Sequence, residues 1–302
     1  MRVTQKMMTT NFTSYIHRQG ETLLKIQQKI ASQKRINTIS DDPIGMSQVL
    51  KYRTKLEVIN QYEENITQGI TRLEVNEQVL DLAAELVGFA KGVAEGHLGL
   101  NIAAEEKRLA AEQIKGLYDQ IMQIANSKFG DNYIFSGHAT DTAPFSRLAD
   151  FSPENYHGDD GTVRIVVAEN VAIDVDADGR NIFMASGGVN IFQQLKNLID
   201  GLENPDSVLG SAQIEATIDP LYNAREQINN KRAEYGPIFY RLQATDEYWS
   251  NLKPKIQDAL AGTEEADIPR AIVELQNLEL AYETTLATAA KIIQPSLMDF
   301  LR

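Results

Sequence analysis

Long heptad patterns of apolar residues, interrupted by one short polar stretch, constrain this chain more than any other feature. The stretch reads QKIASQKRINTISDDPIGMSQ and covers residues 28–48. Before it, an apolar residue recurs at heptad spacing, which predicts a helix that buries one narrow stripe. After it, the heptad resumes at Val49 and runs to Val87, far beyond the ordinary helix length of about 11–12 residues. We therefore expect long helices that pack against one another.

The polar stretch itself predicts where one helix ends and the next begins. Asn37, Thr38 and Ser40 end the first pattern, because short polar side chains compete for the hydrogen bonds of the backbone. Asp42 is suited to cap a new helix, and Pro43 loses nothing at the first helical position by lacking an N–H donor. A similar break is expected at 262–267, before a last heptad that starts at Ile268.

The two ends of the chain carry opposite charge. Residues 1–40 hold seven Lys/Arg and one Glu, a net of +6, whereas residues 264–302 hold three Lys/Arg and seven Asp/Glu, a net of −4. Opposite charge favours packing of the two terminal helices side by side. Two helices leave part of each apolar stripe uncovered, so we expect neighbouring subunits to cover the rest. The residues expected at this assembly interface are Phe12, Ile16, Leu23, Ile26, Ile30, Ile272, Leu275, Tyr282, Leu286, Ile293 and Leu297.

Between the ends, the apolar pattern changes from helical to alternating and back. A break near 96–101 precedes a helix expected to return antiparallel along the first, with Ile102, Leu109, Ile114, Leu117, Ile121 and Ile124 facing inward. Residues 163–167 and 171–175 alternate around Glu169-Asn170, which predicts a hairpin. Helix returns at 190–202 and from about 214 to 260. Pro237 and Pro254 predict kinks or breaks in this last stretch.

These patterns predict a mainly α protein with a small inserted β domain and an antiparallel coiled coil formed by both chain ends. The expected division has three parts: a terminal core of 1–40 plus 264–302, a helical region of 41–130 plus 187–263, and a β-containing domain at 131–186.

Composition excludes several classes of function. The net charge of −13 argues against a general nucleic-acid binder, which needs a cationic surface to displace counterions. The absence of cysteine excludes disulfides and thiolate chemistry. No stretch approaches the roughly 20 apolar residues needed to cross a bilayer, and the N-terminus lacks the pattern of a cleaved secretory signal, so no membrane partner is expected.

Motifs for catalysis or cofactor binding are weak. Residues 174–179, DVDADG, match the first half of a calcium loop, but the twelfth position is Ala185 instead of glutamate, which favours a turn with solvated carboxylates. The four histidines are far apart. Glu264, Glu265 and Asp267 are expected to form an exposed acidic helix start. We therefore predict no enzyme, no cofactor and no metal site; a calcium-regulated or hydrolytic enzyme is the alternative from another class.

The residues around the first break resemble a motif near the start of bacterial flagellins and their relatives. The motif residues here are Arg35, Asn37, Asp41, Asp42, Pro43 and Gly45. Pro43, where flagellin usually carries alanine, and the C-terminal run at 294–302, QPSLMDFLR, resemble the members of the family that join the hook to the filament.

The resemblance implies a structural axial subunit of the flagellum that self-assembles through its terminal helices, which would line a tubular core. It also implies a hook-associated neighbour on one side, flagellin on the other, and an export chaperone before secretion through the flagellar channel without a cleaved signal. Flagellin itself, the filament subunit, is the alternative.

Overall fold

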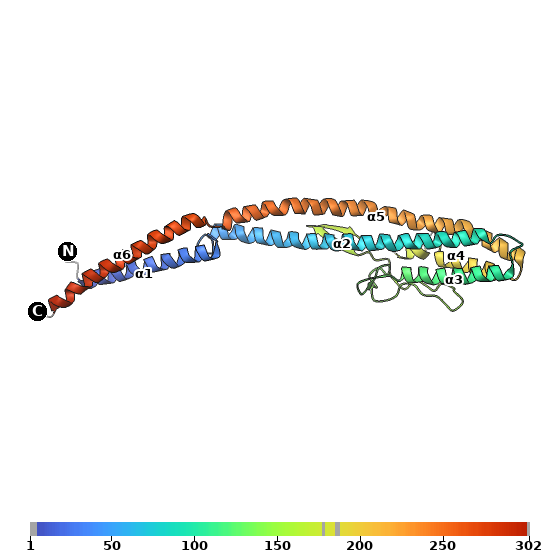
Figure 1. The fold of residues 1–302 in the computed structure, drawn as a ribbon, viewed down its shortest axis with the longest axis horizontal. Coiled ribbons are helices and arrows are strands. Elements are labelled where there is room, and N and C mark those ends of the chain that lie inside the picture. The colour runs from blue at the N-terminus through green and yellow to red at the C-terminus, as the bar shows by residue number, and fades with distance from the viewer. Residues whose placement is uncertain (1–4, 177–178, 185–187, 301–302) are drawn as a thin grey trace. The chain divides into compact units, whose positions relative to one another are not determined.

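The computed structural model describes residues 5–176, 179–184 and 188–300, and of these it describes the side chains of all but 5, 6, 8, 9 and 291–300. The described chain is mainly helical, as predicted (Figure 1). Its α-helices are α1 (Gln5–Ser32), α2 (Pro43–Gly96), α3 (Ala104–Ala125), α4 (Ile191–Glu203), α5 (Ser207–Glu264) and α6 (Ile268–Phe300). Shorter elements are β1 (Lys128–Phe129), β2 (Asn132–Tyr133), β3 (Arg164–Ala168), β4 (Val171–Asp174) and the π-helical turn η1 (Arg180–Met184).

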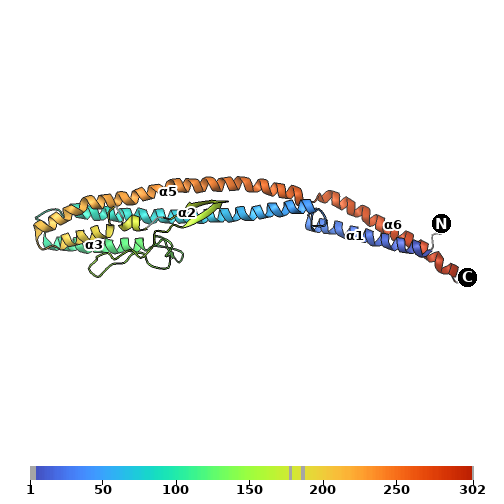
Figure 2. The same ribbon diagram turned by 180° about the vertical axis from the view of Figure 1, so that it is seen from behind.

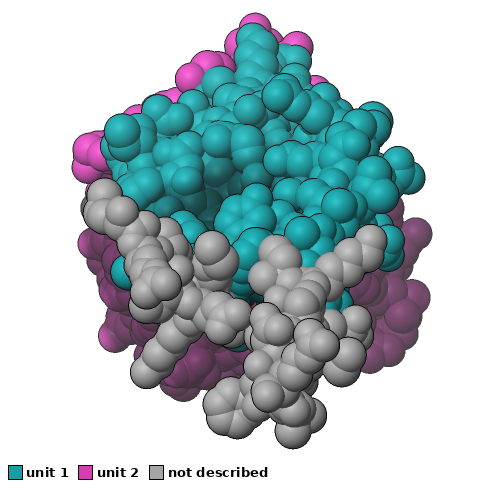
Figure 3. Space-filling model, turned by 90° about the vertical axis from the view of Figure 1, so that its left-hand side faces the viewer, with its two compact units in different colours: residues 1–59, 250–302 teal, residues 60–249 magenta. Residues whose placement is uncertain are grey.

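The chain divides into two compact units, coloured separately in Figure 3. Unit 1 comprises residues 1–59 and 250–302, and unit 2 comprises residues 60–249. Both α2 and α5 contribute a segment to each unit. The division into three domains expected from the sequence stays a prediction.

In unit 1, the two terminal helices lie side by side and run antiparallel, as both ribbon views show (Figures 1 and 2). This confirms the predicted pairing of the chain ends. The side of α1 that is turned away from solvent carries the predicted stripe, with Ile26 buried and the others half-buried. Across from it, α6 contributes a run of small and apolar side chains: Ala271, Leu275, Leu278, Tyr282 and Ala289.

Unit 2 is a helical bundle with one contiguous apolar core, built from its segments of α2 and α5 together with α3 and α4. An aromatic cluster occupies the core beneath α3 and α4. The ring centroids of Tyr118 and Phe192 lie 5.5 Å apart, and Phe145 lies 5.4 Å from Phe183. Such tilted and edge-on pairs stabilise a core beyond the area that they bury. Most of the buried apolar side chains of the described chain belong to this core.

The predicted hairpin is present in unit 2. β3 and β4 pair antiparallel, and Glu169-Asn170 forms the two-residue turn with Asn170 at φ 59°. The hairpin is fastened to helices of the same unit, since Asn65 donates to the carbonyl of Val166 (2.8 Å) and Trp249 to that of Val167 (2.8 Å). The only other sheet among the described residues is the two-stranded pair β1–β2.

Two helical predictions are wrong. Leu109 is exposed on α3, because it lies five residues, or about 140° around the helix, from the buried Ile114. Ile102 precedes the start of α3 at Ala104.

The predicted breaks at Pro237 and Pro254 are also wrong, since α5 is uninterrupted from Ser207 to Glu264. Each proline frees the carbonyl four residues earlier, at Ala233 and Ser250, and both of these residues are exposed. Water can hydrate a carbonyl freed on the solvent side, so the ladder loses one bond without burying an unpaired group.

Candidate assembly surface

The two breaks in the terminal helices are bonded to each other within unit 1. The N–H of Arg35 donates to the carbonyl of Glu264 (2.6 Å), and that of Ala266 donates to the carbonyl of Gln33 (3.0 Å). Gln33 has a positive φ of 57°, which turns the chain out of α1. The segment between α1 and α2 is therefore held against the segment between α5 and α6 by backbone pairing.

The two aspartates of the motif organise the first break. Asp41 Oδ2 accepts hydrogen bonds from the N–H groups of Thr38 (2.8 Å) and Asn37 (3.1 Å). These backbone donors hold the pKa of Asp41 below its ordinary value of 3.8. The carboxylate thus closes the turn that leads from α1 to α2.

Asp42 caps α2, as the sequence predicted, because its Oδ1 accepts from the N–H of Gly45 (2.9 Å). Its Oδ2 accepts from Arg35 (3.2 Å), which also donates to the carbonyl of Thr263 (2.8 Å). The Gly45 N–H and the Arg35 guanidinium lower the pKa of Asp42. Asp42 and Arg35 together link the start of α2 to the end of α5.

The remaining motif residues fit this arrangement. Asn37 donates from Nδ2 to the carbonyl of Lys34 (3.2 Å), and Pro43 is the first residue of α2. Gly45 is packed so closely that an added Cβ would lie 2.5 Å from Asp42 Oδ2 and 2.6 Å from Ile36 Cδ1. Only glycine fits there without a shift of its neighbours.

Sequence reasoning missed the ion pairs of Glu264. The residue is buried at the last position of α5, where Lys34 Nζ lies 2.6 Å from its carboxylate and Arg53 also pairs with it. The expectation of an exposed acidic helix start is therefore wrong for Glu264, whose partners are about 210 residues or more away in sequence. It holds for Asp267, which caps α6 by accepting from the N–H of Arg270 (3.1 Å).

The predicted interface residues divide between two faces of the helix pair. Those on α1, together with Leu275 and Tyr282 on α6, lie half-buried or buried in unit 1. Ile272 and Leu286 remain 42% and 43% exposed, and the side chains of Ile293 and Leu297 lie outside the described residues. The sequence did not single out further large apolar side chains that are exposed on this pair: Met7, Tyr15, Leu24, Val273 and Leu280.

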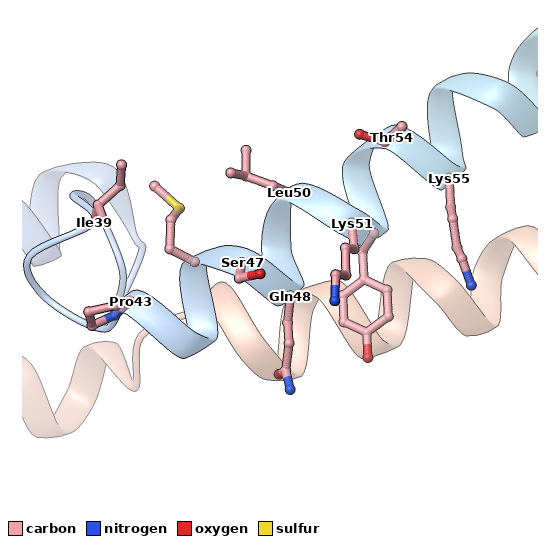
Figure 4. Close-up of a pocket in the computed structure, with 10 residues that line it drawn as sticks. Ile39, Pro43, Ser47, Gln48, Leu50, Lys51, Thr54 and Lys55 are labelled. Carbon is pink, nitrogen blue, oxygen red and sulfur yellow. The ribbon is translucent and has the colours of Figure 1, made fainter.

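Two shallow grooves adjoin this surface. One, of about 470 Å³, runs between α1 and α6 beside Tyr15 and Leu280. The other, of about 700 Å³, lies over the first turns of α2. Figure 4 shows Ile39 on the loop before the helix and Leu50 on the same side of α2, with Pro43 at its start. Each groove has exposed large apolar side chains among polar ones, Tyr15 and Leu280 in the first and Ile39 and Leu50 in the second. Adjoining exposed apolar side chains are typical of surfaces that another protein covers.

Ser146, Glu154 and His157 lie together in unit 2, but not in the order of a nucleophilic triad. Ser146 Oγ lies 3.0 Å from His157 Nε2 and also bonds to Glu154. In a nucleophilic triad the carboxylate orients the imidazole, whereas here it bonds to the serine hydroxyl.

Asp176, expected to be a solvated turn carboxylate, is instead buried and held by Arg72 at 2.5 and 2.6 Å. The expectation is therefore wrong for Asp176, whereas Asp174 is exposed and Asp178 lies outside the described residues.

Comparison with known proteins shows which proteins share this sequence and architecture. The profile of the bacterial flagellin N-terminal helical region matches residues 3–140. The flagellin of Bacillus subtilis is 21% identical over 308 residues, which cover 97% of each chain. The chain is therefore similar to flagellins along nearly its whole length, and it is a structural protein, not an enzyme.

The chain is also similar to flagellar hook-associated protein 3 of Salmonella typhimurium, which is 26% identical over 270 residues, covering 83% of this chain and 84% of the relative. A solved structure of a flagellar hook-associated protein from Vibrio parahaemolyticus superposes with a TM-score of 0.69 at 22% identity. It covers 74% of this chain and 100% of its own. None of the helices in the described part of the chain is long and apolar enough to cross a membrane.

Proposed function

We propose that this chain joins the hook of the bacterial flagellum to the filament, as an axial structural subunit. It is a component of the extracellular flagellum and assembles with other axial proteins. The observation that carries the proposal is the terminal helix pair, which buries one seam but leaves Leu24, Ile272 and Leu280 exposed. A large aliphatic side chain gains about 1.5–3 kcal/mol when fully buried, so covering these residues in an assembly would be favourable.

The proposed partners follow from a position at the junction. Further copies of this chain would cover the exposed faces of α1 and α6. A hook-associated protein would lie on the hook side and flagellin on the filament side. Before export through the flagellar channel, a chaperone would shield the C-terminal helix. The predicted interface residues stay part of this proposal, and Tyr15, Leu24, Val273 and Leu280 join them because they are exposed on the same helix pair.

The alternative is flagellin itself, since the flagellin of Bacillus subtilis aligns along nearly the whole chain. Immunogold labelling separates the two functions: a junction protein labels one band next to the hook, and a filament subunit labels the whole filament.

Complementation of a deletion strain tests the proposal. We expect the deletion to leave hooks without filaments and to release flagellin into the medium, and the parent gene to restore filaments. Leu280→Gln should fail to restore them, whereas Leu109→Gln should succeed, because Leu280 and Leu109 are similarly exposed (66% and 58%) but only Leu280 lies on the terminal helix pair. Attached, normal filaments in the deletion strain would contradict the junction function.

A further inference from the structure

A cavity of about 340 Å³ lies in unit 2, where the turn between α2 and α3 meets the turn between α4 and α5. The first turn of α3 lines it with Lys107 and Arg108. Glu203 and Asn204 line it from the end of α4, and Ser207 from the start of α5. All of these residues belong to one unit, so the site does not depend on any other part of the chain.

Lys107 is the unusual residue of this cavity. It is only 4% exposed, and its Nζ has no hydrogen-bond partner among the described residues. The other charged residues that line the cavity are already paired: Arg108 with Glu105 at 2.7 Å and Glu203 with Lys115 at 2.6 Å. A buried ammonium without a counter-charge is unfavourable, so this position points to an anion.

Two helix N-termini add positive potential at the same place. Ala103, the N-cap of α3, offers no side-chain hydrogen bond, which leaves the first N–H groups of α3 without a capping side chain. The start of α5 also lines the cavity, although Asp206 already accepts from the N–H groups of Val208 and Leu209. N–H groups and the positive end of a helix dipole favour anionic oxygen atoms.

A structural function of Lys107 as a cap of α4 does not account for its buried ammonium group. The C-terminal end of α4 lines the cavity, and its carbonyls could accept from an ammonium group. No such bond is formed, because Nζ makes no hydrogen bond to any described acceptor. Lys107 therefore does not serve as a C-terminal cap of α4.

We propose that this cavity binds a small oxyanion, with Lys107 as its charged ligand and the N-terminal turn of α3 as a source of N–H donors. Phosphate and carboxylate share the required chemistry. Phosphate would come from solution, whereas a carboxylate could also be an acidic side chain of a neighbouring subunit.

Thermal unfolding of the full-length chain tests the proposal, with inorganic phosphate and acetate each compared with chloride at matched ionic strength. We expect the melting temperature to rise with anion concentration and to saturate, by about 3–5 °C at ten times the dissociation constant. Lys107→Met should abolish this rise. Lys196→Met is the matched control, because Lys196 is a largely buried lysine of α4 that is paired with Asp200 (2.6 Å) and does not line the cavity.

The response to the two anions shows which of them the cavity binds. A rise with phosphate alone supports a site for a free tetrahedral anion, and a rise with acetate as well supports one that also accepts a carboxylate. No rise above chloride in the parent, or an equal rise in Lys107→Met, would overturn the proposal. If Lys107→Met does not fold, Lys107→Gln replaces it, and calorimetric titration with phosphate at 25 °C should show one site in the parent and none in the variant.

Discussion

Asp41 and Asp42 are adjacent, yet each carboxylate has its own function in unit 1. Asp41 closes the turn after α1, and Asp42 caps α2 while it holds Arg35. Because Arg35 also reaches the carbonyl of Thr263, a change at Asp42 should affect both breaks at once. The motif is therefore a structural joint, in which each residue type is required by a specific bond.

Acid should loosen this joint. The pKa values of Asp41 and Asp42 are both below 3.8, so their ionised forms are favoured by the fold. Their contribution to stability is present above pH 3.8 and is lost as the pH falls through the lowered folded-state values. We expect the melting temperature, followed by circular dichroism, to fall more steeply below pH 3.8 in the parent than in the double variant Asp41→Asn/Asp42→Asn. Asparagine keeps the cap but does not titrate. Equal slopes would contradict the assignment.

Gly45 gives a second prediction at the residue scale. Alanine usually stabilises a helix by about 1 kcal/mol relative to glycine, but at Gly45 the new Cβ would overlap Asp42 and Ile36, and overpacking costs about 1–3 kcal/mol. We expect Gly45→Ala to lower the free energy of unfolding by about 1 kcal/mol. Gly262→Ala is the control in unit 1, because nothing lies within 4 Å of its Cβ, and it should be neutral or stabilising. Denaturant titration that gives the same sign for both variants would count against the packing argument.

At the scale of elements, the Arg72–Asp176 pair fastens the end of the hairpin region to α2 within unit 2. The two side chains are only 12% and 1% exposed. Removal of one partner leaves the other charge buried and unpaired, which costs about 3–5 kcal/mol, whereas replacement of both by apolar residues is often neutral. We therefore expect Arg72→Met to be strongly destabilised in urea titrations and Arg72→Met/Asp176→Leu to recover most of the loss. If the double variant is as unstable as the single one, packing and not charge explains the effect.

Local rules predicted the elements well where the signal lies within a few residues. The start of α2 at Pro43 and the Glu169-Asn170 turn both follow from short-range backbone and hydrogen-bonding preferences. Predictions failed where a partner far away in the sequence determines whether a residue is buried and paired. Asp176 is neutralised by an arginine 104 residues earlier in sequence.

The candidate assembly surface on α1 and α6 was predictable only in part. Heptad spacing indicated apolar stripes on both terminal helices, but it cannot tell which side of a stripe a single partner helix covers, and the assembly interface itself stays a prediction. The structure shows that α6 buries Ala271 and Ala289 and leaves Ile272 and Val273 exposed. Adjacent positions on a helix differ by about 100°, so a small rotation about the helix axis exchanges buried and exposed residues.

For the whole molecule, the two units differ in how much core each one has. The contiguous core cluster lies entirely in unit 2. The buried apolar residues described in unit 1 are few, and two of them are alanines: Ile26, Ile36, Val49, Ile59, Ala271 and Ala289. Fixing the backbone costs about 1–2 kcal/mol per residue, which so small a core offsets only narrowly. We expect the terminal helices to gain their stability from assembly.

Hydrogen exchange on the purified monomer, compared with the assembled protein, tests this claim most directly. Amides at 10–30 and 270–289 should exchange within seconds in the monomer, while those at 66–87, which belong to the core of unit 2, stay protected. In the assembly, the terminal amides should become protected as well. Protection of the terminal helices in the free monomer equal to that of 66–87 would contradict the account, because it would show that α1 and α6 are stable without neighbouring subunits.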